Sequence, residues 1–208
     1  MNKPTLIIST LILLLAVFVG GNYWYKSSAT TLTTEQKEAL DRNKNTAYGA
    51  QNAKVTIVEF YDPACGTCRS FYPFVKEQMK ANEGKIKLIL RYAPFHIDSF
   101  YVSQMIEAAR YQNKEVEALE VLYKYQDKWA SHSGANVGII WGFLAEVGID
   151  IDKLKEDLKR PEVETRVKQD LADTKTLNVT GTPEFFVNGQ PLKKFGKKEL
   201  KELIDSAL

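Results

Sequence analysis

The chain of 208 residues has only two cysteines and two histidines, and this scarcity excludes several classes of protein. Two cysteines do not build the disulfide framework of a small secreted scaffold. They do not make a structural zinc site, which needs about four ligands, because neither His96 nor His132 stands at zinc-finger spacing from them. Covalent haem attachment requires a histidine directly after the second cysteine of the pair, where this chain has Arg69.

An excess of charge of either sign is also absent from the main part of the chain. The whole sequence has 28 Lys and Arg against 26 Asp and Glu. Lys3 and Lys26 are the only charged side chains among the first 29 residues, so the remainder carries 26 of each sign. A balance of this kind gives no indication of nucleic-acid binding.

The N-terminal segment is the long apolar run of this chain. Residues 6–19 are apolar except for two hydroxyl side chains, and no charged residue occurs between Lys3 and Lys26. We interpret residues 1–29 as a signal peptide or an N-terminal membrane anchor, and the aromatic group at residues 23–25 favours the anchor. A buried core helix is the remaining alternative. Either export segment places the cysteines in the periplasm or at the extracytoplasmic face of the inner membrane, where disulfides persist.

Cys65-Gly66-Thr67-Cys68 stands where a predicted strand passes into a predicted helix. This spacing lets the first helical turn bring the two sulfurs close enough to bridge. Cys65 then lies at the helix N-terminus, where unpaired N–H groups and the helix dipole stabilise a thiolate. We therefore predict that Cys65 attacks and that Cys68, one turn inside the helix, resolves. The four residues alone leave an inert structural disulfide open as the alternative.

The remaining pattern predicts an α/β frame that a helical block interrupts. Val55–Phe60 and Ile86–Tyr92 are β-prone runs on either side of the helix that begins at the cysteines, which predicts a right-handed crossover between parallel strands. A hairpin is expected at residues 184–194, around Asn188-Gly189, and a last helix at Lys197–Ala207. Between these parts, helical periodicity predicts five helices, at residues 101–111, 116–129, 137–147, 151–158 and 161–176.

The segment before the first predicted strand is polar. Thr33 is expected to cap a short helix that continues to Arg42. Tyr48–Ala50 is then expected to turn the chain.

This order of elements, together with four motifs, resembles the thioredoxin fold and within it the DsbA-like group of exported thiol-disulfide oxidoreductases. The motifs are residues 52–60 (NAKVTIVEF), the cysteine pair, residues 91–96 (RYAPFH) and residues 179–189 (VTGTPEFFVNG). The resemblance implies a thioredoxin fold with a helical insertion between the βαβ unit and the C-terminal ββα unit. It predicts a linker and short helix at 30–46, a thioredoxin-like domain at 47–96 and 177–208, and an inserted helical subdomain at 97–176.

The resemblance also implies roles for residues outside the pair. Pro183 corresponds to the cis-proline that these folds place beside the cysteines, so that the backbone of Thr182 pairs with an extended substrate. Glu59 corresponds to an acid buried under the site, where its pKa should be raised and it could relay a proton to or from Cys68 through water. An ordinary turn proline and a solvent-facing carboxylate are the alternatives.

The dipeptide between the cysteines departs from the DsbA pattern, which has a histidine there. Gly66 and Thr67 are expected to contact substrate but supply no charge, so we expect a weaker oxidant than the histidine-bearing members. His96 is interpreted as a hydrogen-bonded loop histidine near the site, and His132 as a surface residue.

These features predict an enzyme, an extracytoplasmic thiol-disulfide oxidoreductase for protein substrates, acting as an oxidase or as an isomerase or reductase. No metal or organic cofactor is required, and a membrane redox partner resets the pair. The N-terminal segment contacts the membrane if it is not cleaved. Two alternatives stay open: the cysteines hold copper for delivery, with His96 as a further ligand, or a chaperone-like module carries a structural disulfide.

Overall fold

The computed structural model describes residue 14, residues 32–42 and residues 47–208. The chain divides into two units, Met1–Thr33 and Thr34–Leu208, and every element named below belongs to the second unit. The predicted signal peptide or anchor lies outside the described residues, apart from Leu14. Among the helices of the described ranges, none is long and apolar enough to cross a membrane.

The central sheet has five strands in the order β1-β3-β2-β6-β7. Strands β2 (Val55–Tyr61) and β3 (Ile86–Tyr92) run parallel in register, and helix α3 (Gly66–Ala81) connects them, as predicted. Strands β6 (Glu184–Val187) and β7 (Gln190–Pro191) form the predicted hairpin, with β6 antiparallel to β2. This arrangement confirms the predicted thioredoxin fold.

One strand replaces a predicted turn. Residues 47–49 form β1 (Ala47–Gly49), which pairs antiparallel with β3, from Ala47 opposite Ile89 to Gly49 opposite Lys87. The prediction of a turn at Tyr48–Ala50 was therefore wrong. A three-residue strand is too short to show an alternating pattern, and its pairing partner lies about forty residues further along the chain.

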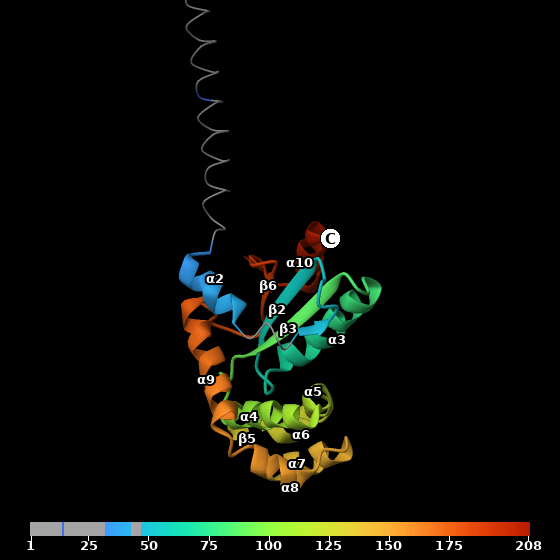
Figure 1. Ribbon diagram of the computed structural model, residues 1–208, viewed down its shortest axis with the longest axis vertical. Helices are drawn as coiled ribbons and strands as arrows, with labels where there is room; N and C mark the ends of the chain where they lie inside the picture. The colour runs from blue at the N-terminus through green and yellow to red at the C-terminus, as the bar shows by residue number, and fades with distance from the viewer. Residues whose placement is uncertain (1–13, 15–31, 43–46) are drawn as a thin grey trace, which may run out of the picture. The chain divides into compact units, whose positions relative to one another are not determined.

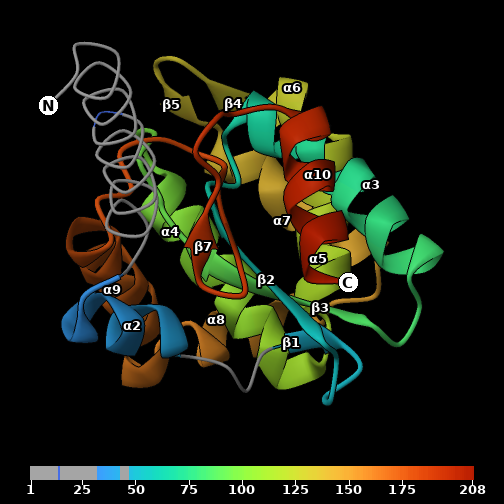
Figure 2. The ribbon, with the colours of Figure 1, turned by 90° about the horizontal axis from the view of Figure 1, so that it is seen from above.

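Two helices cover one face of the sheet. Val55 and Ile57 of β2 lie in one apolar cluster with residues of α3 and of α10 (Lys197–Ala207), the helix predicted at the C-terminus. Figure 2 shows α3 and α10 side by side over the sheet. Because side chains alternate along a strand, Glu59 shares the face of Val55 and Ile57 and therefore lies in the layer of α3.

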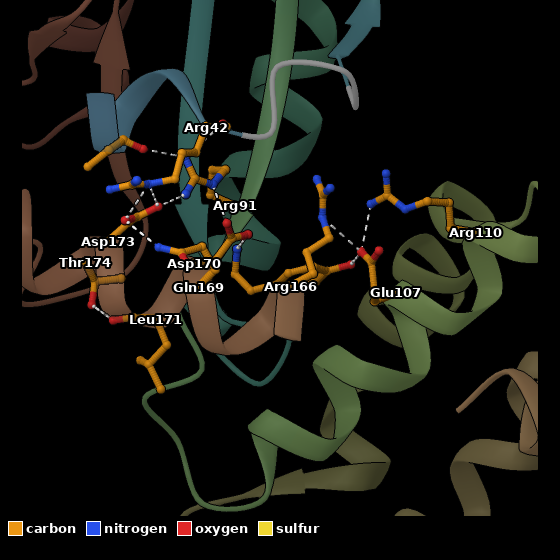
Figure 3. Close-up of polar contacts among 12 residues, drawn as sticks. Arg42, Arg91, Glu107, Arg110, Arg166, Gln169, Asp170, Leu171, Asp173 and Thr174 are labelled. Carbon is orange, nitrogen blue, oxygen red and sulfur yellow. Dashed lines mark hydrogen bonds and ion pairs between the residues drawn. The ribbon is translucent and has the colours of Figure 1, made fainter. Parts of the chain in front are cut away.

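Helices α2 (Thr34–Asp41) and α9 (Pro161–Thr176) form a second packed group, in which α9 contacts β3 and α2 contacts α9. Arg91 of β3 is fully buried between them (Figure 3). Its Nε lies 2.6 Å from Asp170 Oδ1 and its Nη2 lies 2.6 Å from Asp173 Oδ2. Its Nη1 donates to the carbonyl oxygens of Ala39 and Arg42, at 3.1 and 3.2 Å. A guanidinium taken out of water needs such partners, so this side chain fixes α2 and α9 to the sheet.

The helical block lies between β3 and α9 and gathers at one end of the sheet (Figure 1). It contains α4 (Ser99–Ala109), the 3-10 turn η2 (Arg110–Gln112), α5 (Glu115–Lys124), α6 (Gln126–Trp129), α7 (Val137–Glu146) and α8 (Ile151–Asp157). The predicted boundaries of this insert, at residues 97 and 176, stay a prediction.

The helix predicted at residues 116–129 is broken at Tyr125, between α5 and α6. The apolar positions continue at helical spacing as far as Trp129, so the pattern does not reveal the break. Buried Trp129 donates its indole N–H to the carbonyl oxygen of Leu122 at 2.8 Å, which satisfies a carbonyl in the last turn of α5. A two-stranded hairpin of β4 (Ala130–Ser131) and β5 (Gly134–Ala135) follows, which the sequence pattern did not predict.

Candidate active site

Cys65 occupies the N-cap position of α3, with extended backbone angles (φ −78°, ψ 117°). Its sulfur accepts the backbone N–H of Cys68 at 3.4 Å and lies 3.3 Å from the carbonyl oxygen of Thr182. The pKa of Cys65 is lowered to about 5, chiefly by the hydrogen bond from the Cys68 side chain, against the opposing effect of burial. Backbone N–H groups of Thr67 and Cys68 lower this pKa further. The lowered pKa therefore favours the thiolate of Cys65 at neutral pH.

Cys68 has the opposite character. Its side chain is fully buried, and burial raises the pKa of its thiol far above the ordinary value. The hydrogen bond to Cys65 and the negative charge of Glu59 raise this pKa further. Both cysteines are free, so the structure represents the reduced pair. The pKa values of the two thiols are therefore displaced in opposite directions, while attack by Cys65 and resolution by Cys68 stay predictions.

Glu59 is 1% exposed, and neither of its carboxylate oxygens has a hydrogen-bond partner within the described part of the protein. Burial, followed by the charge of Cys65, raises the pKa of Glu59 to about 8. The predicted burial and raised pKa are confirmed. A carboxyl that titrates near neutral pH and acts electrostatically on Cys68 is suited to exchange a proton with that thiol, and this role stays a prediction.

The peptide bond between Thr182 and Pro183 is cis, which confirms that part of the prediction. The segment leads directly into β6, and the Thr182 carbonyl contacts the Cys65 sulfur. Gly66 and Thr67 are exposed in the first turn of α3, beside that sulfur. The structure thus places Cys68, Gly66, Thr67 and Thr182 beside Cys65, with Pro183 following Thr182 and Glu59 close enough to act on both cysteines by charge, while contacts with substrate stay predictions.

Asp62 is a site residue that the sequence analysis missed. It is fully buried and follows β2, and its Oδ2 accepts the backbone N–H groups of Phe95 and His96 at 2.7 and 2.8 Å. Its Oδ1 accepts the N–H of Ala64, and its carbonyl oxygen accepts the N–H of Cys65 at 3.0 Å. Asp62 therefore ties the turn that carries Cys65 to the loop after β3. The one signal in the sequence was its position, directly after a buried strand and before proline.

The two histidines line one groove beside the cysteine pair. This groove has a volume of about 300 Å³ and is also lined by Gly66, Arg69 and Gln126. His96 Nδ1 lies 2.9 Å from Asp62 Oδ2, which confirms the interpretation of a hydrogen-bonded loop histidine. His132 is exposed in the turn between β4 and β5. Among the described side chains, no group of three His, Cys, Asp or Glu residues could hold a metal ion.

A family model described as thioredoxin matches residues 41–206. The chain belongs to the thioredoxin family. This thioredoxin-family protein is similar to the crystal structure of a thioredoxin-like oxidoreductase from Silicibacter pomeroyi, with a TM-score of 0.71, 27% identity, and coverage of 82% of this chain and 96% of that one. Its fold is also that of α-DsbA2 from Wolbachia pipientis, described as a thiol-disulfide exchange protein, at a TM-score of 0.70, 21% identity, and coverage of 84% and 93%. The resemblance to the DsbA-like group is thereby confirmed.

Two curated relatives of this thioredoxin-family protein differ in length. A probable disulfide bond formation protein D from Bacillus anthracis is 29% identical over 171 residues, which cover 74% of this chain and 77% of that protein. A Na(+)/H(+) antiporter NhaA from Herminiimonas arsenicoxydans is 26% identical over 190 residues, which cover 91% of this chain. The match spans only 29% of the antiporter's length.

Proposed function

We propose that this protein is an extracytoplasmic thiol-disulfide oxidoreductase that transfers disulfides to protein substrates through Cys65 and Cys68. The observation that carries the proposal is the opposite displacement of the two pKa values, to about 5 for Cys65 and far upward for Cys68. A stabilised thiolate favours the reduced pair, so the oxidised pair tends to accept electrons from a substrate dithiol. The relatives named for disulfide formation and thiol-disulfide exchange support the same reaction.

The reaction has two exchange steps. A substrate thiolate attacks the Cys65 sulfur of the Cys65–Cys68 disulfide, a mixed disulfide forms, and the Cys68 thiolate leaves. Glu59 in its protonated form, directly or through water, supplies the proton that Cys68 takes up at neutral pH. A second substrate thiolate then attacks the substrate sulfur of the mixed disulfide and releases Cys65 as a thiolate. The substrate loses two electrons and the pair gains them, and a membrane redox partner removes them to restore the disulfide.

Substrate binding in this proposal uses the segment before β6. An extended substrate pairs with the backbone of Thr182, next to the cis Pro183, which brings its sulfur to Cys65. The exposed residues Gly66 and Thr67 leave the approach to the sulfur open. Because the dipeptide carries no charge, we expect a reduction potential between those of two other proteins of this fold, about −270 mV for thioredoxin and about −120 mV for DsbA.

The test uses the oxidised protein and a reduced, unfolded substrate that needs disulfides for activity. We expect the wild-type protein to restore that activity and to end with both thiols free. Cys65→Ser should abolish exchange. Cys68→Ser, given an oxidised substrate instead, should accumulate a mixed disulfide, because its Cys65 thiolate attacks a substrate disulfide, releases one substrate thiolate, and has no Cys68 thiol to resolve the product. A wild-type protein that exchanges with no dithiol, and that is indistinguishable from Cys65→Ser, would refute the proposal.

A further inference from the structure

Gln126 is a buried polar residue of the insert that has no task in the reaction proposed above. It begins α6, and its side chain is 3% exposed. Its Nε2 lies 2.8 Å from the carbonyl oxygen of Pro63 and 3.1 Å from that of Cys65. A primary amide has two N–H donors, so each of these carbonyl groups can accept one of them.

These two hydrogen bonds are the third attachment of the turn that carries Cys65. From the sheet, Asp62 holds the same turn by accepting the N–H groups of Ala64 and Cys65. From α3, the N–H of Arg69 donates to the Cys65 carbonyl at 3.1 Å, as the first bond of the helix. Gln126 adds the contact from the insert, more than sixty residues away in the sequence. The position of the Cys65 sulfur therefore depends on the sheet, the helix and the insert together.

The amide of Gln126 also acts on the charge around the sulfur. Carbonyl oxygens carry partial negative charge, and two of them lie within two residues of a group that must become an anion. Hydrogen bonds from the amide offset this partial charge in a site from which water is largely excluded. Cys68 in α3, Glu59 in β2 and Tyr123 in α5 interact electrostatically with Cys65, and Asp62 holds its backbone N–H. Arg69 of α3 and His96 after β3 line the groove beside Gly66.

We propose that Gln126 is a positioning residue for Cys65, through which the insert favours the thiolate of the nucleophile. The inference rests on the proposed function, because it deepens the account of the same cysteine pair. Gln126 does not contact the reacting sulfur in the structure and acts through the Pro63 and Cys65 carbonyl groups. Loss of its donors should therefore weaken the thiolate without removing either thiol.

The experiment compares two substitutions at this position in the full protein. Gln126→Met conserves the volume but removes both donors, and Gln126→Asn keeps a neutral amide that is one methylene shorter and draws the donors away from the two carbonyl oxygens. The acid dissociation constant of Cys65 is measured from thiolate absorbance at 240 nm in the reduced protein. We expect it to fall about three- to tenfold in Gln126→Met, since a net hydrogen bond contributes about 1 kcal/mol, and in the same direction but less far in Gln126→Asn.

Gln112→Met is the matched control. The amide of Gln112 also bridges backbone groups of the insert, donating to the Asp150 carbonyl at 3.0 Å and accepting the Asp150 N–H at 2.9 Å. Both of these bonds join it to Asp150 rather than to the turn of Cys65, so this variant should titrate as the wild type does. The equilibrium constant for oxidation of glutathione should fall by the same factor as the dissociation constant in the two Gln126 variants only.

An unchanged titration in a folded Gln126→Met protein would overturn the inference, as would an equal change in Gln112→Met. If Gln126→Met does not fold, Gln126→Asn decides the question, because it keeps a neutral amide and adds no charge beside Cys65, and an unchanged titration in that variant would overturn the inference. The titration requires no turnover. A protein that fails to exchange disulfides but shows the expected titrations would therefore refute the proposed function and leave this inference standing.

Discussion

The low pKa of Cys65 depends mainly on its partner in the pair, and this dependence can be tested by replacing Cys68. The Cys68 side chain supplies the largest single effect on the Cys65 thiolate, ahead of the backbone N–H groups of α3. Cys68→Ala removes that donor, while Cys68→Ser keeps a hydroxyl donor in its place. The pair of variants therefore separates the hydrogen bond from the loss of the second sulfur.

The expected magnitude follows from the energy of a hydrogen bond to a charged group, about 1.5 to 3 kcal/mol. Since about 1.4 kcal/mol corresponds to one pH unit, the Cys65 pKa should rise from about 5 to between about 6 and 7 in Cys68→Ala. At pH 6 the thiolate fraction then falls from about nine-tenths to between about one-half and one-tenth. In Cys68→Ser the pKa should stay within about half a unit of the wild-type value.

The assay is a pH titration of reduced protein from pH 3 to 9, followed by absorbance at 240 nm and by the rate of alkylation with iodoacetamide. Cys65→Ser provides the blank, because the remaining Cys68 thiol stays protonated throughout this range. A midpoint in Cys68→Ala within half a unit of the wild type would refute the reasoning. An equal rise in both Cys68 variants would also refute it, because the serine hydroxyl retains the donor.

Two further predictions concern buried charge. Glu59 is protonated in the folded state and ionised in the unfolded state between about pH 4.5 and 8, so the folded state binds more protons and stability falls as pH rises through this window. In the oxidised protein no thiol titrates and the charge of Cys65 no longer raises the Glu59 pKa, so burial alone acts on it. Glu59→Gln should there reduce the loss in unfolding free energy between pH 5 and 8 by up to about 3 kcal/mol, measured by urea denaturation, and an unchanged slope contradicts this. Arg91→Met should cost about 3 to 5 kcal/mol, because it removes the buried cation that pairs with Asp170 and Asp173. Arg42→Met is the control, since that side chain is 43% exposed, and an equal loss in both variants would contradict a special role for Arg91.

Much of the fold could be predicted because its signals are local. The βαβ unit, the Asn188-Gly189 hairpin and the last helix each show the period or turn residues of their own element, and all three are present at the predicted places. The break at Tyr125 and strand β1 could not be predicted in this way. Strand β1 depends on its pairing with β3, which is distant in the sequence. The break depends on the hydrogen bond of a single side chain, from Trp129 to the carbonyl oxygen of Leu122.

The residues of the candidate site fall into the same two groups, those with a signal in the sequence and those without one. Cys65 and Cys68 were evident from their spacing, and Thr182, Pro183 and Glu59 from motifs of a familiar fold. Asp62 and Gln126 were missed because their importance lies in the backbone groups that they bind, and a sequence does not show which carbonyl or N–H groups lie within reach of a side chain.

The sequence by itself determined the cysteine pair, the order of the elements and the balance of charge, because these depend on residue type and spacing alone. The spacing also predicted which cysteine attacks, but only the tertiary structure decided how far the pKa values of the two thiols move apart. The pKa of Cys65 falls because hydrogen bonds converge on its sulfur, and the pKa of Cys68 rises because folding removes that thiol from water next to the buried carboxyl of Glu59. Burial and hydrogen-bond direction are properties of the assembled chain, so they appear only when β2, α3 and the segment before β6 meet.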